Sequence, residues 1–403
     1  MNPPHIAIVG AGPTGLEAAL AAAELGFPFT LYERGTGVAA HLRSFGHVRL
    51  FTPWSLSVSP RMRRLLERAS RPAPDSGATA PTAGELAERV FEPIAELPEI
   101  RAHLALATRV VAIGREGLTK EQEIGTGARE RRPFVLLVVD AAGRERVDRA
   151  DVVLDTTGAY DHPNALGDGG IPAPGERGLA EEIVRYLPDF DADAETWAGQ
   201  TTLLAGGGHS AHTAARALAE LAERDRATRV LWVLGDDALP TPLADDPLPE
   251  RAALVGRARE LAAGASPAVE PLPGRRVVAL ERDGARIAVT LRSGSGASER
   301  RRVDRILSLT GTTGDAALYR QLQFHECYAT LGPMKLSAAL LGAGGGGDCL
   351  AQTSHGVETL ANPEPGFYVL GAKSYGRNAT FLMRVGWEQV AEVFARLADG
   401  RAA

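Results

Sequence analysis

The feature that most constrains the fold of this chain is a glycine turn between an apolar strand and a helix. Residues 5–9 (HIAIV) form a short β-branched run, and a stretch with helical spacing of its apolar residues follows the turn. Gly10 permits the tight turn, Gly12 lets the backbone approach a pyrophosphate, and Gly15 lets the helix pack against the strand. Glu33 ends the next strand, where a carboxylate accepts hydrogen bonds from ribose hydroxyls. This order predicts a dinucleotide site, the alternative being a purely structural βαβ unit.

A second glycine turn of the same kind lies in the middle of the chain. Residues 201–205 (TTLLA) again form an apolar strand, and an amphipathic helix follows the turn. The residues of this turn that we expect to contact a second dinucleotide are Gly206, Gly208, His209, Ser210 and Ala211. His209 and Ser210 also suit N-cap and turn roles. The alternative is that this half of the chain has kept the fold and lost the ligand.

The end of the following strand bears on which nucleotide binds there. Residues 229–237 (RVLWVLGDD) end in Asp236 and Asp237 rather than in arginine or lysine. A carboxylate at this place repels the 2′-phosphate of NADPH and suits the free 2′-hydroxyl of NADH. The sequence therefore mildly favours NADH over NADPH.

Composition excludes several other classes of protein. A length of 403 residues suits two or three domains, and a net charge of −6 without a basic segment gives no reason to expect nucleic acid. The two cysteines, Cys327 and Cys349, rule out a disulfide framework and a Cys-x-x-Cys pair, and no metal site is expected. The chain opens directly on a strand and holds no apolar run of roughly 18 residues. We therefore expect a cytoplasmic protein with no membrane partner.

A third motif carries a resemblance to a known family. Residues 151–155 (DVVLD) run into Thr156-Thr157-Gly158, with a Pro-Asn pair shortly after, and the device recurs in residues 305–315 (RILSLTGTTGD). This pattern resembles flavoproteins with two dinucleotide-binding domains, which include flavin-containing monooxygenases and pyridine nucleotide disulfide reductases. The resemblance implies an α/β fold of two Rossmann-like domains, the second inserted into the first. The expected FAD domain is 1–165 with 305–403, and the expected NAD(P)H domain is 166–304.

The same resemblance implies a set of FAD contacts. Residues 46–54 (GHVRLFTPW) resemble the L-x-L-x-T-P segment that lies beside the flavin in the monooxygenases, whereas VAAHL stands near the place of their Gly-Gly-x-Trp. Residues 366–373 (GFYVLGAK) resemble the last strand and its glycine. The implied FAD-binding residues are Gly10, Gly12, Pro13, Thr14, Gly15, Glu33, Arg34, Arg49, Thr52, Val110, Gly158 and Gly371.

Three residues near the end of the chain are candidates for the chemistry itself. Reduced flavin is an anion, which a nearby cation or helix N-terminus stabilises, and Lys373 and Arg377 are the candidate cations. Lys373 is one of only three lysines in a chain that otherwise uses arginine. Asn378 could donate a hydrogen bond to substrate, or cap the final helix, which we expect from about Thr380 with its N-terminus towards the flavin.

The leading hypothesis is a monooxygenase that acts on a small-molecule substrate with NAD(P)H and molecular oxygen. One alternative is a reductase of an external disulfide, quinone or redox protein, with Cys327 as a partner in electron transfer. Some resembling disulfide reductases carry a cysteine in the first glycine turn, where this chain has Thr14. The other alternative is a flavin-binding protein whose second site is inactive, and a homodimer is compatible with each. Residues 340–348 are expected to cover the substrate pocket, and residues 115–132 to form a solvated excursion.

Overall fold

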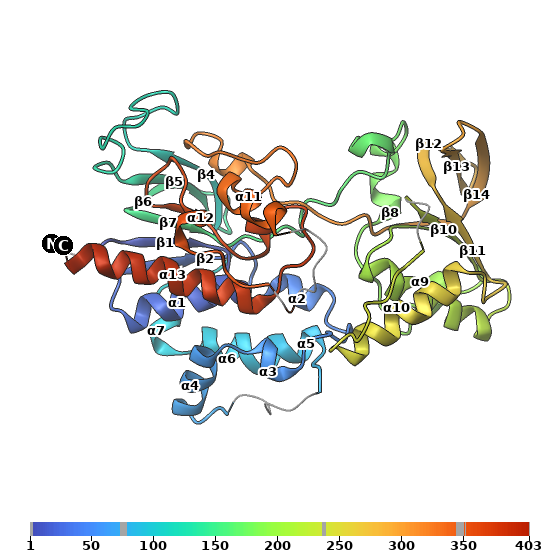
Figure 1. Ribbon diagram of the computed structural model, residues 1–403, viewed down its shortest axis with the longest axis horizontal. Coiled ribbons are helices and arrows are strands. Elements are labelled where there is room, and N and C mark those ends of the chain that lie inside the picture. The colour runs from blue at the N-terminus through green and yellow to red at the C-terminus, as the bar shows by residue number, and fades with distance from the viewer. Residues whose placement is uncertain (1–2, 73–78, 236–238, 344–349, 351, 403) are drawn as a thin grey trace. The chain divides into compact units, whose positions relative to one another are not determined.

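The computed structural model describes residues 3–72, 79–235, 239–343, 350 and 352–402. The chain divides into two compact units (Figure 1): unit 1 holds residues 1–162 and 313–403, and unit 2 holds residues 163–312. The strand Arg305–Ser308, expected with the FAD domain, pairs with a strand of unit 2. The chain therefore returns to unit 1 at Thr313 rather than at residue 305.

Unit 1 is built on a parallel sheet of five described strands whose order places the first strand in the centre. The glycine-turn strand β1 lies between β7 and β2, and Val9 is in register with Asp155 and Tyr32. The strands in spatial order are β16 (Phe367–Val369), β7 (Val152–Asp155), β1 (Ile6–Val9), β2 (Phe29–Tyr32) and β3 (Leu104–Ala105).

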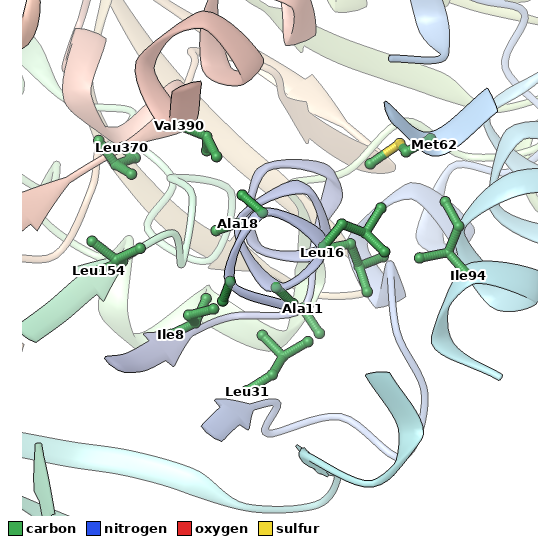
Figure 2. Close-up of a cluster of buried hydrophobic side chains, with 14 of the residues drawn as sticks. Ile8, Ala11, Leu16, Ala18, Leu31, Met62, Ile94, Leu154, Leu370 and Val390 are labelled. Atoms are coloured by element: carbon green, nitrogen blue, oxygen red, sulfur yellow. The ribbon is translucent and has the colours of Figure 1, made fainter. Parts of the chain in front are cut away.

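The two faces of this sheet bury alternate residues of β1. Ile6 and Ile8 point to the face that helix α1 (Pro13–Glu24) covers, in a core shared with α13 (Met383–Ala402). Figure 2 shows Ile8, Leu31 and Leu154 of the sheet gathered beside α1. Ala7 and Val9 point to the other face, which packs on the antiparallel sheet β4 (Arg109–Arg115), β5 (Phe134–Val139) and β6 (Glu145–Ala150). Unit 1 thus has three layers.

The remaining helical segments of unit 1 lie between and after these strands. Residues 83–95 form α5, a π-helical turn η1 and α6 in succession. The segments are α2 (Ala40–Ser44), α3 (Trp54–Ser57), α4 (Pro60–Arg68), α5 (Ala83–Leu86), η1 (Ala87–Phe91), α6 (Glu92–Ala95), α7 (Pro98–Arg101), η4 (Ala317–Tyr319), α11 (Met334–Gly342), α12 (Val357–Leu360) and η6 (Gly371–Tyr375).

Unit 2 repeats the same three-layer plan. Its parallel sheet contains, in spatial order, β11 (Val269–Pro273), β10 (Arg229–Leu234), β9 (Thr201–Ala205), β15 (Arg305–Ser308) and β8 (Ile183–Val184). Leu204 faces helices α9 (His209–Arg224) and α10 (Pro249–Ala262), whereas Leu203 and Ala205 face the antiparallel sheet. The antiparallel strands are β12 (Arg275–Asp283), β13 (Arg286–Ser293) and β14 (Ser298–Val303), and the short helical segments are η2 (Asp168–Gly170), η3 (Arg177–Glu182) and α8 (Ala194–Trp197).

These two units confirm the predicted fold class, an α/β architecture with two Rossmann-like parallel sheets. None of the described helices has the length and apolar composition needed to cross a membrane. The predicted pocket cover, residues 340–348, falls mostly outside the described residues, as does Cys349.

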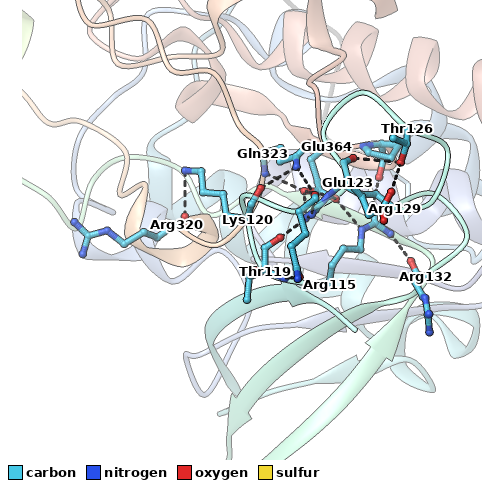
Figure 3. A network of polar contacts seen from close by, with 12 residues as sticks. Arg115, Thr119, Lys120, Glu123, Thr126, Arg129, Arg132, Arg320, Gln323 and Glu364 are labelled. Atoms are coloured by element: carbon cyan, nitrogen blue, oxygen red, sulfur yellow. Dashed lines mark hydrogen bonds and ion pairs between the residues drawn. The ribbon is translucent and has the colours of Figure 1, made fainter. Parts of the chain in front are cut away.

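The excursion between β4 and β5 is largely exposed, as its charged sequence suggested, but two arginines at residues 115 and 129 are buried. Arg129, from the middle of the excursion, has a side chain only 1% exposed and donates two hydrogen bonds to Glu364 from Nε and one from Nη2. Arg115 donates to the other side of the same carboxylate, and Gln323 contributes its backbone N–H (Figure 3). Because a buried charge needs a partner, Arg115 and Arg129 anchor this segment to the body of unit 1 through Glu364.

Candidate functional site

The first glycine turn has the geometry that its three glycines predict. Gly10 has φ +102°, and a Cβ there would lie 2.9 Å from the carbonyl oxygen of Thr156. A Cβ on Gly15 would lie 1.8 Å from the carbonyl oxygen of Gly10. A Cβ on Gly12 would meet no described atom within 4 Å. The turn is therefore packed shut on the sheet side and open at Gly12, where a pyrophosphate would approach.

Helix α1 begins directly at this opening. Its N-cap is Gly12 and Pro13 occupies the first turn, and within the described residues no side chain caps the helix. The backbone N–H groups of the first turn are thus available to an anion at the positive end of the helix dipole. This is the arrangement that the pyrophosphate of FAD requires.

Thr14 packs against two glycines from the far end of the chain. A Cβ on Gly371 would lie 2.7 Å from the Thr14 hydroxyl, and a Cβ on Gly386 would lie 2.8 Å from it. Gly371 opens η6 with φ +73°, and Gly386 lies in the first turn of α13. These contacts bring the segment after β16 and the start of α13 onto the first glycine turn, where the resemblance places them.

Glu33 lies at the end of β2 and is 9% exposed. Its carboxylate accepts hydrogen bonds from the backbone N–H of Ala11 at 2.8 Å and of Gly35 at 2.7 Å. The carboxylate is therefore held against the glycine turn, in the position predicted for a ribose partner. Val110 is buried in β4, in the core beneath Tyr32.

The loops that follow β2 and β7 are joined by contacts that the sequence did not reveal. Arg34, one of the expected FAD contacts, forms an ion pair with Asp161. The rings of His41 and Tyr160 stack with centroids 3.7 Å apart. Burial lowers the pKa of His41 to about 4, so the imidazole is neutral at neutral pH. The sequence did contain a signal for these contacts, because Tyr160 and Asp161 lie only two and three residues after the glycine of the Thr-Thr-Gly turn.

The end of β7 carries a buried ion pair. Lys373 Nζ lies 2.6 Å from Asp155 Oδ2 and 3.2 Å from the Thr157 hydroxyl, and the two charged side chains are 3% and 0% exposed. The other oxygen of Asp155 accepts the Thr157 hydroxyl at 2.7 Å, and the ammonium lies 4.9 Å from the centre of the Tyr319 ring. The predicted cation of the flavin site is thus already neutralised by a carboxylate of the chain.

Arg377 and Asn378 lie in the turn before α13. The backbone N–H of Arg377 donates to Thr330, while its exposed guanidinium makes no ion pair with any described residue. Asn378 Oδ1 accepts hydrogen bonds from both the N–H and the hydroxyl of Thr380. Helix α13 begins at Met383, three residues after the expected start at Thr380. The amide oxygen of Asn378 therefore serves the turn, and its NH₂ group is the part that could reach a ligand.

Two further predicted flavin contacts use their side chains to bind other atoms of unit 1. Arg49 donates from Nη1 to the carbonyl oxygen of Ala80 at 2.5 Å. The Thr52 hydroxyl lies 2.9 Å from the Ser57 hydroxyl at the end of α3. Gly158, in contrast, has φ +74° and open space at its Cβ position among the described residues, so that backbone remains accessible to a ligand.

The second glycine turn, in unit 2, is anchored at its first glycine and open beyond it. Gly206 has φ +140°, and its carbonyl oxygen accepts a hydrogen bond from Trp232 Nε1 at 2.9 Å. Cβ atoms on Gly207 and Gly208 would meet no described atom within 4 Å. His209 and Ser210 are exposed at the start of α9, and the helix has no side-chain cap in the described part of the chain. Ala211 is buried beneath the turn.

Cys327 lies in a turn of unit 1 that packs against the η6 segment. Its N–H donates to Gly332, and the carbonyl oxygen of Thr330 in the same turn accepts from Arg377. Hydrogen bonds from the backbone and then the hydroxyl of Thr330 lower the pKa of the Cys327 thiol. The thiol is buried at 5% exposure and has no disulfide partner among the described residues.

Comparison with known proteins places this pair of glycine turns in a family. The profile of the pyridine nucleotide-disulphide oxidoreductases matches residues 4–325, which is most of the chain. The chain belongs to this family. Its activity is therefore that of a flavin-dependent pyridine nucleotide oxidoreductase, and FAD and a pyridine nucleotide are the cofactors typical of the family. No curated protein sequence matches the chain significantly.

Solved structures with this fold include both reductases and monooxygenases. The bacillithiol disulfide reductase of Bacillus cereus has a TM-score of 0.68 at 15% identity, over 98% of this chain and 99% of that chain. The ornithine hydroxylase of Pseudomonas aeruginosa has a TM-score of 0.64 at 16% identity, over 98% and 99%. A flavin-containing monooxygenase from Stenotrophomonas maltophilia has a TM-score of 0.58 at 16% identity, over 100% of both chains. At this identity the likeness establishes the shared fold.

Proposed function

We propose that this protein is an FAD-dependent monooxygenase that uses NAD(P)H and molecular oxygen to oxidise a small-molecule substrate. When bound, FAD supplies the capacity to accept a hydride and to react with oxygen. The residues that would hold it fit that role. The open backbone at Gly12 and the uncapped start of α1 suit the pyrophosphate, and Glu33 suits the ribose.

The observation that carries the proposal over a disulfide reductase is the environment of Thr14. In the resembling reductases with one catalytic cysteine, the thiol stands in the first glycine turn. Here the turn holds Thr14, whose side chain packs against Gly371 and Gly386. Cys327, the cysteine that the structure describes, lies in another segment and is buried. A thiol in the turn is therefore replaced by a side chain that serves packing.

Within the proposal, Arg377 is the cation that compensates negative charge developing at the flavin. Lys373 is neutralised by Asp155, whereas the guanidinium of Arg377 is exposed and forms no described ion pair. A preorganised cation stabilises charge that forms during reaction. In this proposal Lys373 fixes the end of β7 through Asp155 and contributes no net charge. The NH₂ group of Asn378 donates a hydrogen bond to the substrate.

A reductase of an external disulfide is the second candidate, and the Cys327 turn favours it. Hydrogen bonds from Thr330 that lower the pKa of this thiol would raise the fraction of reactive thiolate. The burial of Cys327 opposes it, because a partner disulfide must reach the sulfur.

Anaerobic stopped-flow absorbance tests the proposal. The FAD-loaded protein is mixed with NADH or NADPH and then with oxygenated buffer, while the flavin spectrum is followed. The expected result is bleaching by the nucleotide, then reoxidation through a transient spectrum distinct from those of oxidised and fully reduced flavin. Two results together would instead establish the reductase. The flavin would reoxidise directly, without the transient, and the protein would reduce a disulfide whereas its Cys327→Ser variant would not. No bleaching with either nucleotide would leave a flavin-binding protein whose second site is inactive.

A further inference from the structure

Unit 1 contains a pocket of about 400 Å³ that neighbours the buried Lys373. It lies where the anchored excursion between β4 and β5 meets the chain just after its return from unit 2. We call it the Tyr319 pocket. The side chains that define it are Lys120, Asp315, Tyr319, Arg320, Phe324 and Glu326.

The pocket carries charges of both signs that the chain leaves largely unused. Within the described residues, neither the Glu326 carboxylate nor the Arg320 guanidinium makes an ion pair. Lys120 Nζ donates a hydrogen bond to the carbonyl oxygen of Arg320 at 3.2 Å (Figure 3). This bond uses one of the three N–H donors of the ammonium group. Asp315 accepts the N–H of Ala317 with one oxygen, and its other oxygen lies 3.8 Å from His162 Nε2, so this carboxylate is already used by the chain. A carboxylate and a guanidinium thus remain available to a ligand.

The rest of the lining is aromatic. The rings of Tyr319 and Phe324 lie 4.6 Å apart, and both pack on Phe367 of β16. Tyr319 is 4% exposed, so its ring supports the wall from behind, and the half-buried Phe324 presents the accessible apolar surface. Such a surface suits an apolar carbon chain better than a second charged group.

The walls of the pocket are held by the buried cluster of Arg115, Arg129 and Glu364. This cluster anchors the excursion, and Gln323 Nε2 then donates to the carbonyl oxygens of Lys120 and Gln122 at 2.8 and 3.0 Å (Figure 3). A buried ion-pair cluster gives little net stability compared with apolar packing. Its effect here is to fix two chain segments against each other at the rim of the pocket.

We propose that the Tyr319 pocket binds a small zwitterion, in which an amine and a carboxylate are joined by an apolar carbon chain. The amine meets Glu326, the carboxylate meets Arg320, and the chain lies on Tyr319 and Phe324. This inference goes beyond the monooxygenase proposal and does not rest on it, because the pocket is complete within unit 1 and needs no nucleotide or oxygen.

Isothermal titration calorimetry of the oxidised, FAD-loaded protein without nucleotide tests the pocket. The probes are 6-aminohexanoate, hexylamine and hexanoate. Hexylamine carries only the amine of the zwitterion, and hexanoate carries only its carboxylate. We expect 6-aminohexanoate to bind about tenfold or more tightly than either half, because only the zwitterion uses both charges. Equal affinity of all three probes, or no saturable binding of 6-aminohexanoate, would overturn the proposal.

Matched variants assign the two ends of the ligand. Glu326→Gln should lower the affinity for 6-aminohexanoate about tenfold and leave the affinity for hexanoate unchanged. Arg320→Met should also lower the affinity for 6-aminohexanoate about tenfold, and it should leave the affinity for hexylamine unchanged. Glu67→Gln, an exposed carboxylate on α4, is the control and should change nothing. Equal losses in the control and in Glu326→Gln would reject the site. Should a variant fail to retain FAD, the comparison of the three probes on the unaltered protein still decides.

Discussion

The two glycine turns share one backbone plan and differ in how they are fixed. In unit 1, Val9 before the turn is in register with Asp155, whose carboxylate pairs with buried Lys373. In unit 2, Ala205 before the turn is in register with Ser308, a small neutral residue. The third turn position is Gly15 in the first and Ala211 in the second.

The difference matches two ways of using a nucleotide. The first turn is locked by Thr14, by the Glu33 carboxylate and by the ion pair at the end of β7, which suits a cofactor that stays bound through many turnovers. The second turn leaves Gly207 and Gly208 open and His209 exposed, which suits a nucleotide that must enter and leave in each cycle. The contrast can be tested position by position.

Breaking the ion pair should have the largest effect. Lys373→Met leaves Asp155 charged and buried without its partner, which typically costs about 3–5 kcal/mol. We expect urea unfolding of the FAD-free protein to show a loss of this size. Ser308→Ala in unit 2 removes no charge and should cost about 1 kcal/mol.

The double variant Asp155→Asn, Lys373→Met separates stability from chemistry. Removing both charges should restore most of the lost stability, because the uncompensated charge is gone. The rate of flavin reduction by the nucleotide should also recover. A rate that stays low in a refolded double variant would show that Lys373 acts on the flavin directly, as the sequence alone suggested.

Exchanging the third turn residues should have the next largest effect. Gly15→Ala places a Cβ 1.8 Å from the carbonyl oxygen of Gly10, and such overpacking costs about 1–3 kcal/mol. The variant should purify with little FAD, as the ratio of flavin to protein absorbance will show. Ala211→Gly, its counterpart, should cost no more than about 1 kcal/mol and leave flavin content intact. Full FAD content in Gly15→Ala would mean that the first turn is less rigid than the structure indicates.

The local features of both turns were predictable because they are encoded by neighbours in sequence. The strand at residues 201–205 was predicted with its exact bounds, and the presence of a helix after the turn was predicted, whereas the helix already begins at His209. The glycines follow from backbone geometry that other residues cannot adopt, so Gly10 and Gly206 were identifiable from spacing alone.

The contacts between distant segments were not predictable. Lys373 and Asp155 are 218 positions apart, and Arg129 and Glu364 are 235 apart. No spacing rule connects such residues, so Lys373 was assigned to the flavin and Arg129 to solvent. Neither ion pair could be foreseen, because a charged side chain in a sequence shows no sign of the partner that permits its burial. The role of Lys373 at the flavin stays a prediction.

A titrating residue distinguishes the helices that follow the two turns. His212, the fourth residue of α9, is 4% exposed, whereas the fourth residue of α1 is Leu16. Burial lowers the pKa of His212 to about 4, with a smaller contribution from the nearby charge of His209. The unfolded chain therefore binds a proton first as the pH falls below about 6.5. The stability that this depressed pKa provides is complete above that pH and is lost between about 6.5 and 4.

His212→Leu should remove this part of the pH dependence. Hydrogen exchange of the β9 and β10 amides, measured near pH 7.5 and near pH 5, reports unit 2 alone. The native protein should lose on the order of 2 kcal/mol more protection than the variant on going to the lower pH. His47→Gln, in an exposed loop of unit 1, is the control. Identical pH profiles for the native protein and His212→Leu would show that the imidazole is protonated or solvated in the folded state.

The smallest predicted effect concerns which nucleotide the second turn accepts. Asp236 and Asp237 lie outside the described residues, and the proposed preference for NADH rests on their charge and their place after β10. Replacing them with Arg and Ser removes repulsion of the 2′-phosphate and adds a partner for it. The ratio of kcat/KM for NADH to that for NADPH should fall about tenfold, or about 1.4 kcal/mol. An unchanged ratio would mean that discrimination lies elsewhere in unit 2. Flavin content should stay constant in the variant, since the first turn holds FAD independently of the second.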